Sequence, residues 1–167
     1  YRESPSLVFG GKGNGVKQMK TAAIVLAGGK GTRMQTAIQK QYLLVNGKPL
    51  IVYALEAFEQ SPVDEIVLVT GAADIGQVKE QIVNQYQISK VSYIVSGGKE
   101  RYHSVYEGLK VLSQCETVLI HDGARPLLSQ AIIQRAIDGA RMYGACVVGM
   151  PVKDTIKRTD ADGFALE

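Results

Sequence analysis

The strongest constraint on the fold is a regular alternation of short apolar runs with longer amphipathic stretches. The runs have the length of buried strands, and the longer stretches carry apolar residues at helical spacing. Strands that alternate with helices form a parallel sheet covered on both faces. The sequence therefore predicts an α/β fold with three layers and a mainly parallel, twisted sheet. We expect strands at residues 21–27, 65–70, 91–95, 117–121 and 145–150, and helices at residues 50–60, 74–86, 104–112 and 130–143.

The apolar spacing also indicates which side of a helix faces the sheet, because residues three and four apart share one face. Asp74 and Ser104 stand at two expected helix starts, where a short polar side chain can cap the first turn. The residues expected to face the sheet are Leu50, Tyr53, Ala54, Ala57 and Phe58, then Val105, Leu109 and Leu112, and then Ile133, Ile137 and Ala140.

Both ends of the chain depart from this alternation. Residues 1–18 contain several glycines and no apolar face, so we expect a disordered leader or tag-like tail, with Met19 as the natural start. Residues 19–150 then form the α/β domain. Residues 152–157 alternate like an exposed strand and 160–163 are a turn signal, so 151–167 is expected to begin a β-arm that is truncated at Glu167.

Charge and cysteine content exclude several classes of protein. The net charge is +3, but residues 1–20 hold four basic residues and one acidic residue, which leaves a neutral body. A neutral body argues against a nucleic-acid-binding surface. No apolar stretch has the length of a transmembrane helix, so no membrane partner is expected. Cys115 and Cys146 are too few for a disulfide framework, which favours a reducing, cytoplasmic setting.

The loops after residues 27, 95 and 121 should carry the chemistry, because ligands of parallel α/β folds bind beyond the carboxyl ends of the strands. The first loop reads LAGGKGTRM over residues 26–34. Glycines let backbone N–H groups approach a phosphate, and Arg33 and Lys40 can stabilise charge that develops there. The string is neither a P-loop nor a dinucleotide motif, since Met34 occupies the third glycine position. The alternative is a tight turn with solvated charges.

The second loop reads GGKERYHS over residues 97–104. Ser104 is placed to cap the helix that follows, and a helix N-terminus can accept an anion or the polar edge of a base. The alternative is that Ser104 is only a cap and Arg101 is only solvated. His103 is expected to be a surface or capping residue rather than a ligand.

The third loop reads HDGARP over residues 121–126. Asp122, at the end of a strand that faces a phosphate-binding turn, suits Mg²⁺, which takes one or two carboxylates and fills its shell with phosphate and water oxygens. The alternative is an ion pair between Asp122 and Arg125 that closes the loop. His121 is expected to be structural.

Four motifs taken together resemble a known family. LAGGKGTRM followed by KQYL (residues 40–43) is similar to the signature of sugar-nucleotide-type nucleotidyltransferases, and GGKERYHS, HDGARP and PVKDTIK (residues 151–157) follow in order. From Met19 to Glu167 the chain resembles the 2-C-methyl-D-erythritol 4-phosphate cytidylyltransferases of the non-mevalonate isoprenoid pathway. The resemblance implies a Rossmann-like nucleotidyltransferase fold, CTP as co-substrate, a sugar-alcohol phosphate as acceptor, Mg²⁺ and a homodimer joined by the completed arm.

The resemblance also implies a role for each matching residue. Arg33 and Lys40 match the transition-state stabilisers, and Asp122 matches the metal-binding aspartate. The residues that match groups binding the cytidine triphosphate are Ala27, Gly28 and Gly29 at the phosphates, and Gly98, Arg101 and Ser104 in the base-recognition loop, while Arg125 and Thr155 match groups that hold methylerythritol phosphate.

Three features depart from the family pattern. Gln39 stands where the family usually has proline, which is expected to loosen the loop that carries Lys40. Lys99 stands where some members have an aspartate that contacts the cytosine. The chain stops at Glu167, before the C-terminal part of the family, so we expect CTP binding to survive better than turnover.

Three other functions stay open at this point. The chain could transfer CMP to another polyol phosphate, such as ribitol 5-phosphate, although PVKDTIK separates it from that family. It could be a truncated CTP-binding core without turnover. An NAD-binding domain is disfavoured by the missing third glycine and by the Arg33–Lys40 pair.

Overall fold

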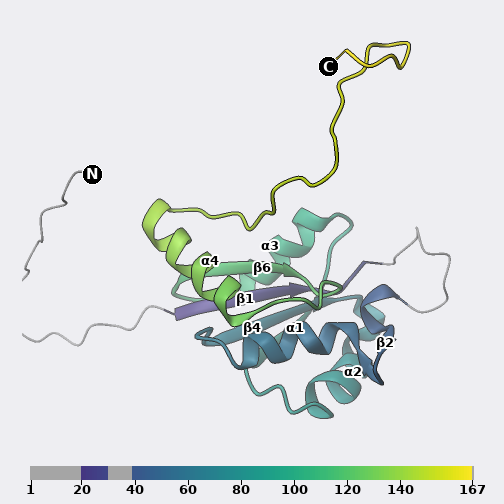
Figure 1. The fold of residues 1–167 in the computed structure, drawn as a ribbon. Helices are drawn as coiled ribbons and strands as arrows, with labels where there is room; N and C mark the ends of the chain where they lie inside the picture. The colour runs from purple at the N-terminus through teal and green to yellow at the C-terminus, as the bar shows by residue number, and fades with distance from the viewer. Residues whose placement is uncertain (1–19, 30–38, 167) are drawn as a thin grey trace, which may run out of the picture.

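The four central strands form one parallel sheet, as the sequence predicted. The structure is a computed structural model that describes residues 20–29 and 39–166 (Figure 1). The strands are β1 (Lys20–Leu26), β4 (Glu65–Thr70), β5 (Val91–Ser96) and β6 (Cys115–Asp122). Their order in the sheet is β5-β4-β1-β6, and every neighbouring pair is parallel. None of the described helices has the length and apolar character needed to cross a membrane.

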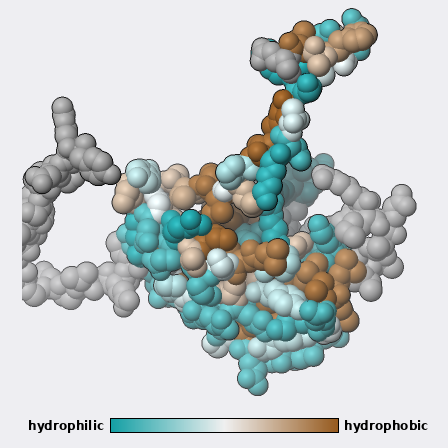
Figure 2. Space-filling model, in the orientation of Figure 1, coloured by the Kyte–Doolittle hydropathy of each residue, from teal (hydrophilic) through white to brown (hydrophobic). Residues whose placement is uncertain are grey.

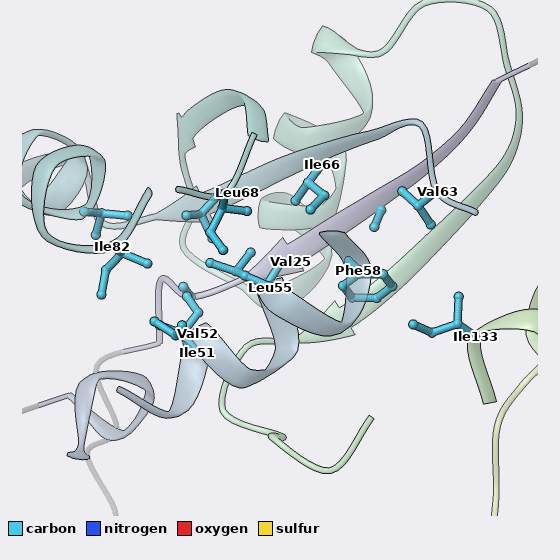
Figure 3. Packing of buried hydrophobic residues seen from close by; sticks show 14 of the residues in the cluster. Val25, Ile51, Val52, Leu55, Phe58, Val63, Ile66, Leu68, Ile82 and Ile133 are labelled. Carbon is cyan, nitrogen blue, oxygen red and sulfur yellow. The ribbon is translucent and has the colours of Figure 1, made fainter. Parts of the chain in front are cut away.

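One face of the sheet carries the larger core. It is covered by α1 (Leu50–Glu59), by the α2 (Ile75–Val78) and η4 (Lys79–Asn84) segment, and by α4 (Gln130–Tyr143). Figure 3 shows the side chains of these helices meeting those of β1 and β4 in one continuous cluster. Burial of this apolar surface is the main favourable contribution to folding. The labelled side chains are Val25, Ile51, Val52, Leu55, Phe58, Val63, Ile66, Leu68, Ile82 and Ile133.

The opposite face is covered by α3 (Arg101–Val111), which packs on a smaller cluster around Ile24, Val67 and Val69. Gly108 is the buried residue of this helix. A Cβ atom at Gly108 would lie 2.8 Å from Ile24 Cγ2 and 3.3 Å from Val69 Cγ2, so only glycine allows the helix this close to the sheet. The three predicted layers are therefore confirmed.

The predicted helix faces are confirmed in α4 and only partly in α1 and α3. Ile133 and Ile137 are buried, as expected. In α1, Ala54 and Phe58 are buried, but Ile51, Val52 and Leu55 take the places expected for Leu50, Tyr53 and Ala57, which are half-buried. This helix is apolar on nearly all sides, so its spacing does not select one face. In α3, Leu109 is 42% exposed, whereas Leu112, just after the helix, packs against the smaller cluster as expected, together with Val111.

Two expected helix starts were wrong. The structure begins α3 at Arg101, with Glu100 as its N-cap, so Ser104 lies inside the helix and does not cap it. The expected helix from Asp74 is built of three short pieces, η3 (Ala72–Asp74), α2 and the π-helical η4, and the Asp74 side chain makes no capping hydrogen bond. Its carboxylate instead accepts a hydrogen bond from Gln39 Nε2 at 3.0 Å.

A small hairpin follows the glycine-rich loop. The 3₁₀ helix η2 (Lys40–Tyr42) leads into β2 (Leu44–Val45), which pairs antiparallel with β3 (Lys48–Pro49). The turn between them is Asn46-Gly47, with φ angles of 50° and 75°. Glycine and asparagine tolerate these left-handed angles better than other residues do.

The expected strand at residues 145–150 is absent, and so is the expected strand at 152–157. These residues are exposed and pair with no described strand, and a strand exists only through hydrogen bonds to a neighbour. The segment that follows α4 runs away from the sheet (Figure 1). The turn expected at 160–163 is present, since Gly163 N donates to Asp160 O at 3.2 Å and one bridge joins Thr159 to Ala165.

Candidate active site

The candidate site lies where the order of the sheet reverses. The chain passes from β1 to β4 and β5 on one side and then crosses to β6 on the other side of β1. Ligands of open α/β sheets bind at such a reversal, outside the carboxyl ends of the strands. Leu26 at the end of β1 is in register with Asp122 at the end of β6. The predicted glycine turn and the predicted acidic residue are therefore neighbours.

The glycine turn follows β1, and its described backbone has no conformation that only glycine can adopt. Ala27 N donates to Val69 O at 2.6 Å and Gly123 N donates to Leu26 O at 2.8 Å, which fixes the base of the turn. Gly28 and Gly29 do not have positive φ angles. A Cβ atom at Gly28 would make only ordinary contacts, and one at Gly29 would meet nothing within 4 Å. Among the described residues, nothing in the fold itself requires glycine at these two positions.

The second half of the motif is only partly visible. Arg33 lies outside the described residues, which resume at Gln39. Lys40 is exposed at the start of η2. Its neighbour Gln41 is buried and donates through Nε2 to the carbonyl oxygen of Ala27 and, at 3.4 Å, to that of Gly29. This contact holds the segment that carries Lys40 against the glycine turn.

Further hydrogen bonds fix η2. Tyr42 Oη and Thr70 Oγ1 are 2.9 Å apart, which joins η2 to the end of β4. Burial raises the pKa of the Tyr42 hydroxyl, while the hydrogen bond to Thr70 opposes this rise. Gln39 uses its side chain to reach Asp74, at 3.0 Å, and Gln41, at 2.7 Å. The expected loosening at Gln39 is thus countered by two hydrogen bonds that a proline could not make.

Asp122 is held by two arginines, one from the first turn of α3 and one from the loop after β6. Arg101 donates to Asp122 Oδ1 from Nε at 3.1 Å and from a terminal nitrogen at 3.0 Å. Arg125 pairs with Asp122 Oδ2 at 3.0 Å. The ion pair that was the alternative for the third loop is therefore present, and Arg101 adds a partner from the first turn of α3. Through Asp122, the segments that follow β5 and β6 meet at the site.

The loop after β5 is closed by Ser104. Its hydroxyl oxygen accepts a hydrogen bond from Gly98 N at 3.1 Å. A Cβ atom at Gly98 would lie 2.4 Å from the Cβ of His103, so this close approach requires glycine. His103 is a capping residue, as expected, because its Nδ1 accepts from Glu100 N at 3.3 Å in a reciprocal capping box.

His121 has a structural place behind the loop after β6. Its ring meets Phe58 edge to face at 5.6 Å, and Nε2 donates to the carbonyl oxygen of Arg125 at 3.0 Å. Burial lowers the pKa of the His121 imidazole, and the hydrogen bond to the Arg125 carbonyl partly opposes this. The neutral ring thus holds the backbone of the loop that presents Arg125.

Thr155 is not brought to this site. It is exposed in the segment that runs away from the sheet (Figure 1). Gly98 lies in the adjoining loop after β5, and Ser104 lies in the first turn of α3. The carboxyl edge of the sheet carries the other expected residues that the structure describes, which are Ala27, Gly28, Gly29, Lys40, Arg101, Asp122 and Arg125.

The side chains around Asp122 determine which kind of metal ion site this region could form. The described residues contain no cluster of three or more His, Cys, Asp or Glu side chains that could hold an ion. Both Asp122 oxygens are paired with arginines, so its negative charge is already balanced. Mg²⁺ commonly takes most of its ligands from phosphates and water. The residues present fit an ion that arrives with a triphosphate, and do not fit a resident ion.

Sequence reasoning missed two features of the site. Gln41 and the Tyr42–Thr70 pair connect η2 to β1 and β4, and no motif assigned them a role. A single glutamine carries no pattern, so its place beside the glycine turn became visible only when the two segments were brought together. The available signal was its position directly after Lys40.

Comparison with known proteins finds relatives that match most of this chain. The structure of a protein from Anaerococcus prevotii described as 4-diphosphocytidyl-2C-methyl-D-erythritol synthase matches with a TM-score of 0.75 and 32% identity, over 88% of this chain and 62% of that one. Among curated relatives, 2-C-methyl-D-erythritol 4-phosphate cytidylyltransferase of Clostridium kluyveri is 49% identical over 144 residues. That of Lachnospira eligens is 50% identical over 145 residues.

These findings define the fold as that of the α/β nucleotidyltransferases. The family model of IspD, 2-C-methyl-D-erythritol 4-phosphate cytidylyltransferase, matches residues 21–167, and the chain belongs to this family. The matches cover 86% of this chain and 62–63% of the relatives from Clostridium kluyveri and Lachnospira eligens, so the chain spans somewhat less than two thirds of their length.

Proposed function

We propose that the chain is the nucleotide-binding part of a cytidylyltransferase that transfers CMP from CTP to 2-C-methyl-D-erythritol 4-phosphate. The products would be CDP-methylerythritol and pyrophosphate. Family membership supports the reaction class. The observation that carries the proposal is the open glycine turn at the sheet reversal. A Cβ atom at Gly28 or Gly29 would clash with no described atom, so packing does not explain these glycines. The buried hydrogen bond from Gln41 to Ala27 holds the segment of Lys40 beside the turn.

The proposed chemistry is a direct displacement. A phosphate oxygen of the acceptor forms a bond to the α-phosphorus of CTP, and the bond from that phosphorus to the bridging oxygen of pyrophosphate breaks. The acceptor phosphate is already an anion, so no base is needed to activate it. Positioning and charge stabilisation are then the main contributions of the protein. We assign the stabilisation of the α-phosphate to Arg33 and Lys40, and contact with the triphosphate to the backbone of Ala27, Gly28 and Gly29.

The remaining site residues are assigned by their place around the turn. The loop of Gly98, Arg101 and Ser104 would hold the cytosine end of CTP, as its closure by the Ser104 hydroxyl supports. Arg125 would hold the acceptor phosphate, since its guanidinium is exposed and already bound to a carboxylate oxygen. Thr155 would join it only if the segment after α4 folds back over the site.

We propose Mg²⁺ as the companion of CTP, with Asp122 as its protein ligand. When bound, the ion would neutralise charge on the triphosphate. One Asp122 oxygen would have to exchange an arginine for the ion. The triphosphate attracts the released arginine, because guanidinium groups bind phosphate as well as carboxylate.

We further propose that residues 151–167 belong to an arm that joins two copies of the protein. Val147, Met150, Val152 and Ile156 are exposed along the segment after α4, and Figure 2 shows apolar atoms on it. Exposed apolar groups of this kind mark interaction surfaces. A sedimentation coefficient that keeps the value of a monomer at all concentrations would contradict a dimer of this chain.

We also propose a cytoplasmic location for the protein, with which its two free cysteines agree.

A second candidate is a CTP-binding core without turnover. The position of Thr155 away from the site favours it, because the acceptor would lose one of its proposed contacts. The two possible acceptors, methylerythritol phosphate and ribitol 5-phosphate, are distinguished by letting them compete in the turnover assay.

The first experiment is pyrophosphate release by the chain with CTP, Mg²⁺ and methylerythritol phosphate. Release that depends on all three supports the cytidylyltransferase. CTP binding by titration calorimetry without release supports the binding core. Absence of both binding and release would contradict the proposed function.

The substitution Gly29→Ala tests the glycine turn. The added methyl group meets no described atom, so the thermal unfolding temperature should stay the same or rise slightly. CTP affinity should fall by about tenfold, the effect of losing one hydrogen bond to a charged group. Gly76→Ala is the matched control, because its Cβ also meets nothing within 4 Å and lies in α2. Unchanged CTP affinity in Gly29→Ala would argue against a phosphate at this turn.

A further inference from the structure

The buried Gln41 side chain holds the segment of Lys40 against the glycine turn, and its contacts have a second consequence for the turn itself. It is 4% exposed, although its amide is polar. Nε2 donates to the carbonyl oxygen of Ala27 and to Gln39 Oε1 at 2.7 Å, and it lies 3.4 Å from the carbonyl oxygen of Gly29. Burying an amide is unfavourable unless its hydrogen bonds are made. Two of the partners here are carbonyl oxygens of the glycine turn itself.

The Ala27 contact fixes the direction of one peptide group. The described peptide bonds are all trans, and in a trans peptide the C=O and N–H groups point in opposite directions. Because the Ala27 carbonyl points toward Gln41, the N–H group of Gly28 points away from it. The Ala27 N–H is already used by Val69 O. The Gly28 N–H donates to no acceptor within residues 20–29 and 39–166, so it is the first donor that the turn offers.

The amide of Gln41 is itself held from the other side. Gln39 accepts from Gln41 through Oε1 and donates through Nε2 to Asp74 Oδ2 at 3.0 Å. Asp74 belongs to the segment that follows β4. A chain of two amides therefore connects that segment to the carbonyl of Ala27, and each amide fixes the orientation of the next.

We propose that Gln41 is a positioning residue that turns the Ala27–Gly28 peptide so that the Gly28 N–H faces a phosphate oxygen of the nucleotide. The inference rests on the proposed function, and it adds a residue to that site. Gln41 touches neither the nucleotide nor the reacting atoms. It acts through the backbone, because it holds the Ala27 carbonyl toward the protein and so leaves the Gly28 N–H facing the opposite way.

The test is the substitution Gln41→Met, which keeps an unbranched side chain of similar length and removes the donor. We expect the dissociation constant for Mg²⁺–CTP to rise by about tenfold in titration calorimetry, the effect of misaligning one hydrogen bond to a charged group. The amide resonance of Gly28 should shift on titration of the unsubstituted chain with inorganic pyrophosphate, and should shift less in Gln41→Met. Gln77→Met is the control, because Gln77 is exposed and its side-chain amide donates to Gln81 and not to the glycine turn.

A second variant separates positioning from folding. In Gln41→His the ring Nε2–H can occupy the place of the glutamine Nε2, so the affinity for Mg²⁺–CTP should return to within about threefold of the unsubstituted value if one hydrogen bond is restored. Thermal unfolding shows whether each variant is folded at the temperature of the titration. Equal affinity in Gln41→Met and the unsubstituted chain would overturn the inference alone, and so would equal losses in the two folded variants. An unsubstituted chain that binds no CTP would overturn the proposed function and this inference with it.

Discussion

Replacing Lys40 by alanine is expected to lower kcat for pyrophosphate release by at least about a hundredfold, the scale of losing one preorganised charge-stabilising donor. Lys40 is exposed at the start of η2, and the neighbouring Gln41 holds this helix against the glycine turn. Its ammonium group therefore has the freedom to reach a phosphate while its backbone is fixed. Because the charge is needed in the transition state, kcat should fall much more than the affinity for CTP.

The control for this substitution is Lys79→Ala. Lys79 is also exposed, but it lies in η4 on the helical layer and away from the glycine turn. Its removal should leave kcat within about twofold, since surface substitutions away from a site change little. A loss below fivefold in Lys40→Ala would refute the assigned role. The same measurement on Arg33→Ala tests the other proposed stabiliser.

The centre of the parallel sheet could be predicted from sequence because β1 and β4 are buried along almost their whole length. β4 is buried along its whole length, and its residues 66–69 form an uninterrupted apolar run in the sequence. The run at 145–150 looks the same, but forms no strand, because strand formation depends on a partner that the local sequence does not specify. The Asn46-Gly47 pair is a turn signal from which the small hairpin could also be predicted.

The loops that form the candidate site could be predicted from sequence, but the contacts between them could not. The rule for parallel sheets placed the chemistry in the loops after three strands, and the structure brings these loops to one edge. The contacts that join them are long-range. Arg101 and Asp122 meet because α3 crosses the sheet, and Gln41 meets Ala27 because η2 returns to the end of β1. Such pairs follow from packing, and no local periodicity contains them.

Replacing Gly108 by valine is expected to destabilise the whole fold. The Cβ atom alone would lie 2.8 Å from Ile24 Cγ2, a methyl group of a fully buried and β-branched side chain that cannot rotate away without moving β1. Overpacking of this kind costs up to about 3 kcal/mol, and the better helix propensity of valine over glycine offsets only a small part of it. Thermal unfolding should therefore shift downward by up to about 12 °C for a chain of this size.

Gly76→Val is the matched control, because a Cβ atom there meets nothing within 4 Å in α2, and its effect should stay within about 0.5 kcal/mol. Equal destabilisation by the two substitutions would contradict the packing argument. The valine at position 108 also tests how the fold positions the site. Arg101 reaches Asp122 from the first turn of α3, so a helix pushed off the sheet should lengthen that contact. Weaker CTP binding at a temperature where Gly108→Val is still folded would show that the close approach at Gly108 sets the position of Arg101.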